Sequence, residues 1–303
     1  MYASIPSPPT NVLEVGPLEI HYYGILIAIG IAVALTWVRR RYERFGGDPD
    51  LVDRVLVWAV VAGFVGARLA YASTHLHRFE GRPEAILFVW EGGLAFFGGL
   101  TFGAITAAVL VLRWTDGGRY GDLPRFVDAA APGVPLAQAI GRWGNYFNQE
   151  LFGTPSDLPW AVEIDPANRP EQYQEAATFH PTFLYESLYN LVVVAILLTV
   201  EKRADLRRGS LLFVYLILYG IGRFLLELIR TDTTFRLLGI SRNGWVSILA
   251  IIAGVLALRW WQQRARAAGV RHEEDNDTSP AVGTASAPSS TDDRTPDSTS
   301  EGR

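Results

Sequence analysis

Long apolar runs recur along most of this 303-residue chain, and they constrain its fold more than any other feature. A helix needs about 20 predominantly apolar residues to cross the hydrocarbon core of a bilayer. The runs do not alternate between apolar and polar residues, so they predict membrane-spanning helices rather than strands of a barrel. Seven such stretches occur, at residues 22–38, 52–74, 93–114, 126–145, 183–200, 210–229 and 244–261. We therefore expect an all-α integral membrane bundle of seven transmembrane helices.

The fourth of these stretches is the least regular, because it contains Asp128, Pro132 and Pro135.

The C-terminal part of the chain differs from the rest: residues 271–303 are poor in apolar residues and rich in Ser, Thr, Pro and Asp, which is typical of disorder. We expect one membrane domain over residues 1–270 and a disordered acidic tail over 271–303. The absence of cysteine excludes disulfides, thiol nucleophiles and cysteine metal sites.

Arginine-rich connections alternate with connections that are poorer in arginine. The rich ones contain "RRRYERFGG", "RWTDGGRYGDLPR", "EKRADLRRG" and "RWWQQRARAAGVR". The positive-inside rule places these four in the cytoplasm. The N-terminus and the long connection from about residue 146 to 182 are then predicted outside, and the C-terminal tail in the cytoplasm. The N-terminus has no basic region before its first apolar run, so we do not expect a cleaved signal peptide.

With this orientation, most ionisable residues of the predicted helices lie toward the outer side. Charged side chains are costly inside a bilayer and usually face the interior of the bundle, so their clustering predicts a basic cavity that opens at the outer leaflet. The residues concerned are Arg68, Arg142, Arg223, Glu227 and Arg230, with His21, Tyr23, His180 and Glu186 at helix ends.

Each of these residues also has a structural interpretation. An arginine near a helix end can extend to the lipid headgroups. Arg223, Glu227 and Arg230 are spaced i, i+4, i+7, so Arg223 and Glu227 are expected to form a supporting ion pair that leaves Arg230 as the free cation at the rim. His21 lies beside two tyrosines and equally fits an anchor at the membrane interface.

The stretch "GRWGNYFNQELFG", residues 141–153, is the densest polar cluster of the membrane domain. On a continuing helix, Arg142, Asn145 and Asn148 form one polar stripe. Arginine offers a planar fork of donors that binds phosphate oxygens, and asparagine amides can complete such a site without adding charge. An ordinary helix end, with Asn and Gly as capping residues, accounts for the same residues. The spacing alone does not decide between a phosphate site and a helix end.

This stretch resembles the signature of the bacterial prolipoprotein diacylglyceryl transferases. The similarity runs through Gly141, Arg142, Gly144, Asn145, Asn148, Glu150 and Gly153, and further matches in the same order cover residues 20–260. These are "HYYG" at 21–24, "GAR" at 66–68, "WEGGLAFFGG" at 90–99, "HPTFLYE" at 180–186 and "GRFLLELIR" at 222–230. The resemblance implies a seven-helix enzyme of the plasma (inner) membrane with its active site toward the outer face.

It also implies the reaction. The diacylglyceryl group of phosphatidylglycerol is transferred to the lipobox cysteine thiol of a preprolipoprotein signal peptide, which forms a thioether and releases glycerol 1-phosphate. By matching position, the implied catalytic residues are Arg142, Arg230 and Tyr23. The implied substrate-binding residues are Arg142, Asn145, Asn148, Glu150, Gly153, Arg68 and His21, with Arg223 and Glu227 in support.

One position departs from the family pattern. Well-known members carry a histidine, proposed as the base that deprotonates the thiol, where this chain has Phe97. The chain is expected to use no cofactor, no metal and no nucleic acid; its partners are the lipid bilayer and the two substrates. An anion or lipid transporter and a structural membrane subunit are the alternatives, although repeated halves, which transporters commonly show, are not visible here.

Overall fold

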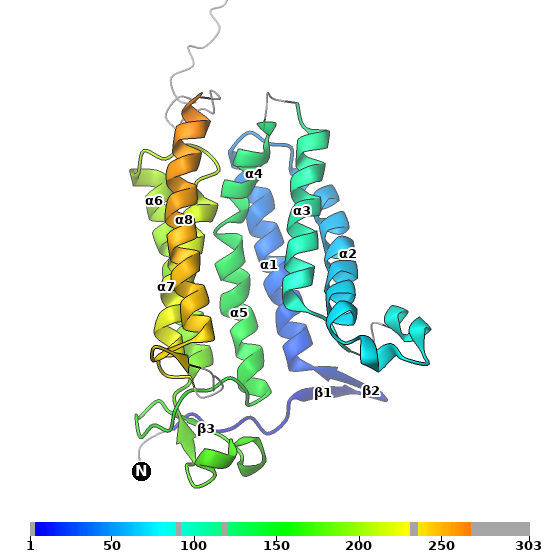
Figure 1. The fold of residues 1–303 in the computed structure, drawn as a ribbon, viewed down its shortest axis with the longest axis vertical. Helices are drawn as coiled ribbons and strands as arrows, with labels where there is room; N and C mark the ends of the chain where they lie inside the picture. Colours follow the sequence, from blue (N-terminus) through cyan, green and yellow to red (C-terminus); the bar gives the residue numbers. More distant parts are fainter. Residues whose placement is uncertain (1–3, 89–91, 117–119, 231–235, 268–303) are drawn as a thin grey trace, which may run out of the picture.

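The computed structural model describes residues 4–88, 92–116, 120–230 and 236–267. Within these ranges the chain is mostly helical, as expected, with three two-stranded antiparallel pairs of short strands (Figure 1). The helices are α1 (Tyr22–Arg44), α2 (Pro49–Thr74), α3 (Phe96–Trp114), α4 (Leu123–Ala130), α5 (Gly133–Phe147), α6 (Thr182–Arg203), α7 (Leu211–Glu227) and α8 (Arg242–Ala267). The strands are β1 (Val12–Val15), β2 (Leu18–His21), β3 (Val162–Glu163), β4 (Thr178–Phe179), β5 (Arg236–Leu237) and β6 (Ile240–Ser241). The predicted disordered tail lies outside the described residues.

Each of the seven predicted stretches contains helix, but the fourth is divided. α4 ends at Ala130 and α5 begins at Gly133, with Pro132 between them, because proline cannot donate the backbone hydrogen bond that a continuous helix needs. Five of the described helices are long and apolar enough to cross a membrane: α1, α2, α3, α6 and α8. α5 has 15 residues and α7 has 17, so both are shorter than the five.

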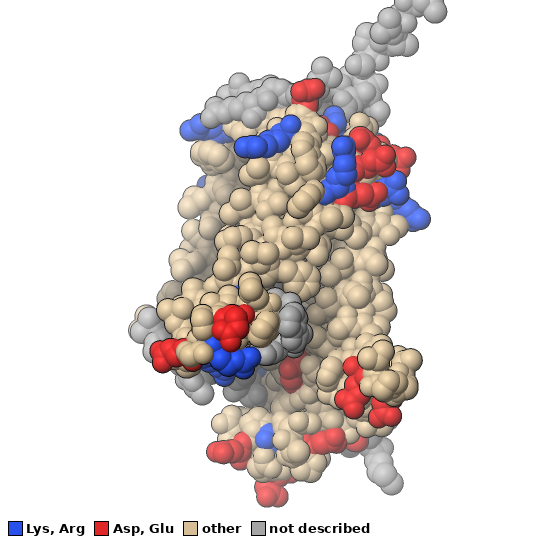
Figure 2. Space-filling view, turned by 90° about the vertical axis from the view of Figure 1, so that its right-hand side faces the viewer, with Lys and Arg blue, Asp and Glu red and all other residues tan. Residues whose placement is uncertain are grey.

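The helices form an elongated bundle in which α5 lies between the group α1–α3 and the group α6–α8 (Figure 1). α2 packs along α3, α1 along α5, α5 along α6, and α7 along α8. Figure 2 shows that charged side chains on one long face gather toward its two ends, while the central belt is almost entirely uncharged. This distribution fits a bundle whose middle is surrounded by lipid.

Small residues allow the close contact between α2 and α3. A methyl group added at Gly98 would lie 2.5 Å from the backbone oxygen of Gly66, and one added at Gly66 would lie 2.4 Å from Phe102. Helices in lipid gain little from apolar burial against one another, so they associate through such close backbone packing. The pairing holds the segment between α2 and α3 at the lower end of the bundle.

Two polar connections tie the upper end together. Arg41 of α1 and Glu201 of α6 form a buried ion pair. Asp128, which fell inside the predicted fourth span, instead caps the start of α7: its carboxylate accepts hydrogen bonds from the backbone N–H groups of Gly209 (2.6 Å) and Leu211 (3.0 Å). These contacts fix α1, α4, α6 and α7 relative to one another.

The lower end carries the connection from residue 148 to 181, with β3 and β4 and a small apolar core that includes Phe152, Phe179 and Phe183. The N-terminal segment lies at the same end, because Ile5 exchanges backbone hydrogen bonds with Ala161 and Glu163. This agrees with the expectation that the N-terminus and the long connection lie on one side of the membrane.

Candidate active site

The polar stretch of residues 141–153 begins in the last turns of α5. α5 ends at Phe147, and the chain then turns sharply through Gln149 and Leu151, which both have positive φ (50° and 58°). The helix thus ends within the signature, at the last residue of the polar stripe, so both interpretations of this stretch hold in part. Asn148 is the C-cap residue of α5, and its backbone N–H bonds to the carbonyl of Gly144.

The polar side chains of this turn nevertheless remain together. The carboxamide oxygen of the buried Asn145 accepts a hydrogen bond from Arg142 (3.4 Å), and its amide group donates to Glu150 (2.8 Å). The amide of Asn148 also donates to Glu150 (3.3 Å). Glu150 thus orients both asparagines, and one of them contacts the guanidinium of Arg142.

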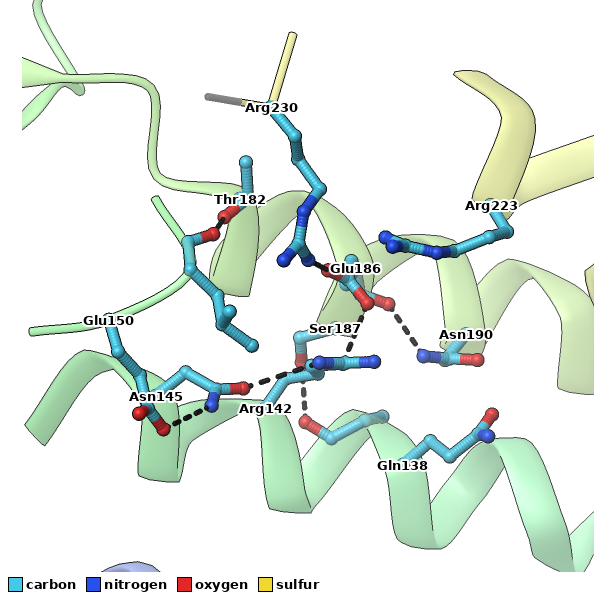
Figure 3. A network of polar contacts seen from close by, with 12 residues as sticks. Gln138, Arg142, Asn145, Glu150, Thr182, Glu186, Ser187, Asn190, Arg223 and Arg230 are labelled. Atoms are coloured by element: carbon cyan, nitrogen blue, oxygen red, sulfur yellow. Dashed lines mark hydrogen bonds and ion pairs between the residues drawn. The ribbon is translucent and has the colours of Figure 1, made fainter. Parts of the chain in front are cut away.

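Glu186, in the second turn of α6, lies at the centre of the site (Figure 3). One of its carboxylate oxygens is 2.7 Å from Nε of Arg142, and the other is 3.8 Å from Nη1 of Arg230. Its side chain is only 7% exposed. The sequence placed Glu186 near the predicted cavity but assigned it no catalytic or binding role, although it closes the "HPTFLYE" motif, which was the available signal.

Arg230 reaches Glu186 from outside helix α7. The i, i+7 relation to Arg223 fails because α7 ends at Glu227, and Arg230 instead forms an isolated β-bridge with Gly153. Its side chain is 5% exposed and lies next to Glu186, so the expectation of a free cation at the rim is wrong. The backbone bridge, rather than helical periodicity, positions this arginine.

The bridge needs a glycine at position 153 because there is no room for a side chain there. Its backbone N–H bonds to the carbonyl of His180 (3.0 Å), and an added Cβ would lie 2.8 Å from the Cβ of His180 and 3.0 Å from the carbonyl oxygen of Ile229. The next residue, Thr154, donates its N–H to Ile229 (2.8 Å). The glycine of the signature therefore lets two backbone segments meet beside Glu186.

The expected ion pair between Arg223 and Glu227 is present, at 3.1 Å along α7. Glu227 is buried and also accepts a hydrogen bond from Asn243 of α8 (3.4 Å). Arg223 points toward Glu186 (Figure 3) and lines the same small cavity of about 20 Å³ as Arg142 and Glu186. That cavity has room for a water molecule, so a larger anion requires these side chains to move.

Tyr23 and His21 lie at the start of α1, next to the signature. A methyl group added at Gly144 would lie 2.4 Å from the Tyr23 ring, so the ring rests directly on this glycine. His21 is the exposed last residue of β2 and precedes α1. Nδ1 of His180 forms a hydrogen bond with the Tyr185 hydroxyl, at 3.1 Å.

Arg68 is used differently from the other arginines. Its guanidinium donates to the backbone carbonyls of Ala85, Ile86, Phe88, Gly92 and Gly93. These bonds use all five donors, which leaves none for a phosphate. Arg68 also lines a separate cavity of about 160 Å³ beside Arg78 and Arg82. The structure shows Arg68 holding the segment between α2 and α3, and its expected substrate-binding role stays a prediction.

Phe97, at the position of the missing histidine, lies in the first turn of α3 and is 77% exposed. Its side chain cannot accept a proton. Phe97 therefore cannot act as the base that the resemblance implies for this position.

Comparison with known proteins identifies the family. The family model described as prolipoprotein diacylglyceryl transferase matches residues 10–260. A phosphatidylglycerol--prolipoprotein diacylglyceryl transferase of Frankia alni is 44% identical over 262 residues, which is 85% of this chain and 67% of that protein. Transferase 2 of Streptomyces coelicolor is 42% identical over 84% of this chain and 80% of its own length. The corresponding protein of Leifsonia xyli is 43% identical over 86% and 82%. The chain belongs to the prolipoprotein diacylglyceryl transferase family.

Proposed function

We propose that this protein transfers the diacylglyceryl group of phosphatidylglycerol to the lipobox cysteine thiol of preprolipoproteins and releases glycerol 1-phosphate. The observation that carries the proposal is the gathering of three arginines around Glu186: Arg142 and Arg230 pair with its carboxylate, and Arg223 lines the same small cavity as Arg142 and Glu186. The names of the relatives contain phosphatidylglycerol and prolipoprotein, which supports this donor lipid and this class of acceptor. A cluster of arginines is the expected binding site for a lipid phosphate.

In this reaction the thiol sulfur forms a bond to the glyceryl carbon while the bond from that carbon to the phosphate oxygen breaks. The electron pair of the broken bond passes to the phosphate, and the thiol proton passes to the phosphate or to water. Arg142 and Arg230 hold the phosphate and stabilise the charge that grows on it. One such preorganised contact typically contributes about 3 to 4 kcal/mol to transition-state stabilisation, by analogy with oxyanion sites.

The surrounding residues are proposed to shape this site. Asn145 positions the guanidinium of Arg142, and Glu150 orients Asn145 and Asn148. Gly153 admits the backbone segment that carries Arg230. Tyr23 packs on Gly144 at the same end of α5, and His21 directly precedes α1 there.

The membrane arrangement is proposed from the helices and the charge distribution. The five longer helices each cross the bilayer once. α4 and α5 together make a sixth pass and α7 makes a seventh, all in the plasma (inner) membrane. The 17 residues of α7 extend about 26 Å, so the bilayer is slightly thinned there or the flanking turns complete the span. The arginine-rich connections lie in the cytoplasm and the site faces outward, where preprolipoproteins emerge.

Cysteine accessibility tests this topology directly, because the chain has no cysteine of its own. In intact cells, Asn168→Cys in the long connection should react with a membrane-impermeant maleimide, whereas Asp205→Cys between α6 and α7 should react only after the cells are opened. The reverse pattern would place the active site in the cytoplasm.

A transfer assay tests the activity. Purified protein in vesicles is given phosphatidylglycerol labelled in its acyl chains and a lipobox peptide, with a peptide carrying serine in place of the lipobox cysteine as the control. We expect label on the cysteine peptide alone. Movement of label between vesicles without transfer to the peptide would indicate a transporter. Absence of both transfer and movement would indicate a structural subunit. Either outcome contradicts the proposal.

A further inference from the structure

Glu186 places a negative charge in the middle of the proposed phosphate site. Its carboxylate contacts Arg142 at 2.7 Å and Arg230 at 3.8 Å, and it lines the cavity that Arg142 and Arg223 also line (Figure 3). An anion site gains affinity from arginines and loses it from a carboxylate at such range. Phosphate binding by itself therefore does not explain why this buried position carries a glutamate.

The reaction changes the charge of the phosphate. Phosphatidylglycerol is a phosphodiester with one negative charge. The released glycerol 1-phosphate is a phosphomonoester, and at neutral pH a monoester carries about 1.5 to 2 negative charges because its second pKa is near 6. A fixed carboxylate repels a dianion about twice as strongly as a monoanion, since the interaction energy is proportional to charge.

We infer that Glu186 sets the charge selectivity of the site, so that the phosphodiester is accepted and the phosphomonoester product is expelled. This inference rests on the proposed function. In the structure the Glu186 carboxylate pairs with Arg142 and Arg230. The incoming diester takes over part of these contacts, and the second negative charge that appears on transfer is repelled by the carboxylate that remains in place. Glu186 is thus a specificity-determining and product-releasing residue.

A purely structural role predicts a different behaviour. If Glu186 only held the two arginines in position, its neutralisation would loosen them and weaken the binding of both phosphates. If it sets charge selectivity, its neutralisation tightens the binding of both, and of the monoester more. Because the binding free energy scales with ligand charge, a gain of about 3-fold for a diester corresponds to about 10-fold for a dianion.

The test measures binding through ligand-dependent thermal stabilisation of the purified protein, which yields dissociation constants without any turnover. The probes are glycerol 1-phosphate and glycerophosphoglycerol, the deacylated diester. For Glu186→Gln at pH 8, we expect the monoester to bind at least about 10-fold more tightly than it binds wild type, and the diester about 3-fold more tightly. At pH 5 the monoester is largely a monoanion, so the two gains should become equal.

Two variants serve as controls. Glu186→Asp keeps the charge and should keep the wild-type ratio of the two dissociation constants. Glu201→Gln removes the carboxylate of the other buried arginine pair on α6, near the opposite end of the helix, and should lower stability without changing that ratio. If the Glu186→Gln protein does not fold, the Glu186→Gln, Arg230→Gln double variant is compared with the Arg230→Gln single variant. In both of these proteins Arg230, one of the arginines that pair with Glu186, is already absent.

Weaker binding of both probes, or equal gains at pH 8, would overturn the inference. Failure of the proposed function is a separate result, because it appears as an absence of transfer by the wild-type protein in the vesicle assay. The binding measurement is independent of that outcome.

Discussion

Nε of Arg142 lies 2.7 Å from the Glu186 carboxylate, and this ion pair joins the last turns of α5 to the second turn of α6. The two residues belong to motifs 40 or so positions apart in the chain. Asn145 contacts the same guanidinium from within α5. The planar fork of Arg142 is therefore held from two sides, which is the preorganisation that a phosphate site requires.

Replacing Arg142 with lysine should nearly abolish transfer while the protein still folds. An ammonium keeps the charge but loses the planar fork, and the loss of one such contact corresponds to roughly a 100-fold or greater reduction in rate. Initial rates in the vesicle assay measure this, with Arg39→Lys, an exposed arginine at the other end of the bundle, as the matched control. Activity within a few-fold of wild type would mean that Arg142 only anchors α5 at the membrane interface.

Gly153→Ala should displace Arg230. The added methyl group would lie 2.8 Å from the Cβ of His180 and 3.0 Å from the Ile229 carbonyl, so the backbone bridge must shift at a cost of about 1 to 3 kcal/mol. We expect a lower unfolding temperature together with a strongly reduced transfer rate. Gly141→Ala is the control for stability, because a methyl group there meets nothing within 4 Å. Equal unfolding temperatures for the two variants would rule out the tight backbone joint.

Glu227→Gln should lower the folded yield more than the activity of the protein that remains. Removing one partner of a buried ion pair strands the other charge and costs about 3 to 5 kcal/mol, and Glu227 and Arg223 are 4% and 19% exposed. Detergent-extracted yield and specific activity are measured separately. Glu84→Gln, in an exposed pair, serves as the control. Normal yield with lost turnover would place Glu227 in the catalytic machinery.

Arg68→Lys should destabilise the segment between α2 and α3. Lysine has three donors on one nitrogen and cannot reproduce the five bonds that Arg68 makes to backbone carbonyls. We expect a lower unfolding temperature and faster proteolysis near residues 75–88, with the KM for phosphatidylglycerol little changed in the folded fraction. A large rise in that KM at unchanged stability would return Arg68 to the phosphate site.

The absence of the family histidine at Phe97 leads to a prediction about the thiol. A cysteine thiol has a pKa near 8.5, and neighbouring cations lower it by a unit or more, so the arginines can supply the thiolate without a dedicated base. His21→Gln and His180→Gln should each keep at least about a tenth of wild-type activity. The pH profile should follow the substrate thiol, with no added inflection between about pH 5 and 8, where histidine bases titrate.

Loss of transfer in either histidine variant, in protein that is folded and still binds phosphatidylglycerol, would assign the missing base to that residue. A histidine that affects only folding would instead lower the yield and leave the specific activity unchanged.

The sequence alone determined the features that depend on local spacing. Apolar runs predicted where helices form, and the i, i+4 spacing predicted the pair between Arg223 and Glu227. The signature predicted that Arg142 and Asn145 act together, since they lie one turn apart on α5. All of these relations are fixed by the geometry of one helix, so the order of residues is sufficient to find them.

Only the tertiary structure decided which distant residues meet. Helical periodicity placed Arg230 at the rim, but the helix ends at Glu227 and a backbone bridge to Gly153 carries Arg230 to Glu186. Arg68 was expected among the substrate-binding residues, and only the structure showed that its guanidinium binds the backbone carbonyls between α2 and α3. Glu186 became the centre of the site through contacts with Arg142 on another helix and with Arg230 beyond α7. These outcomes depend on where separate helices end and how closely they pack, which no spacing along the chain specifies.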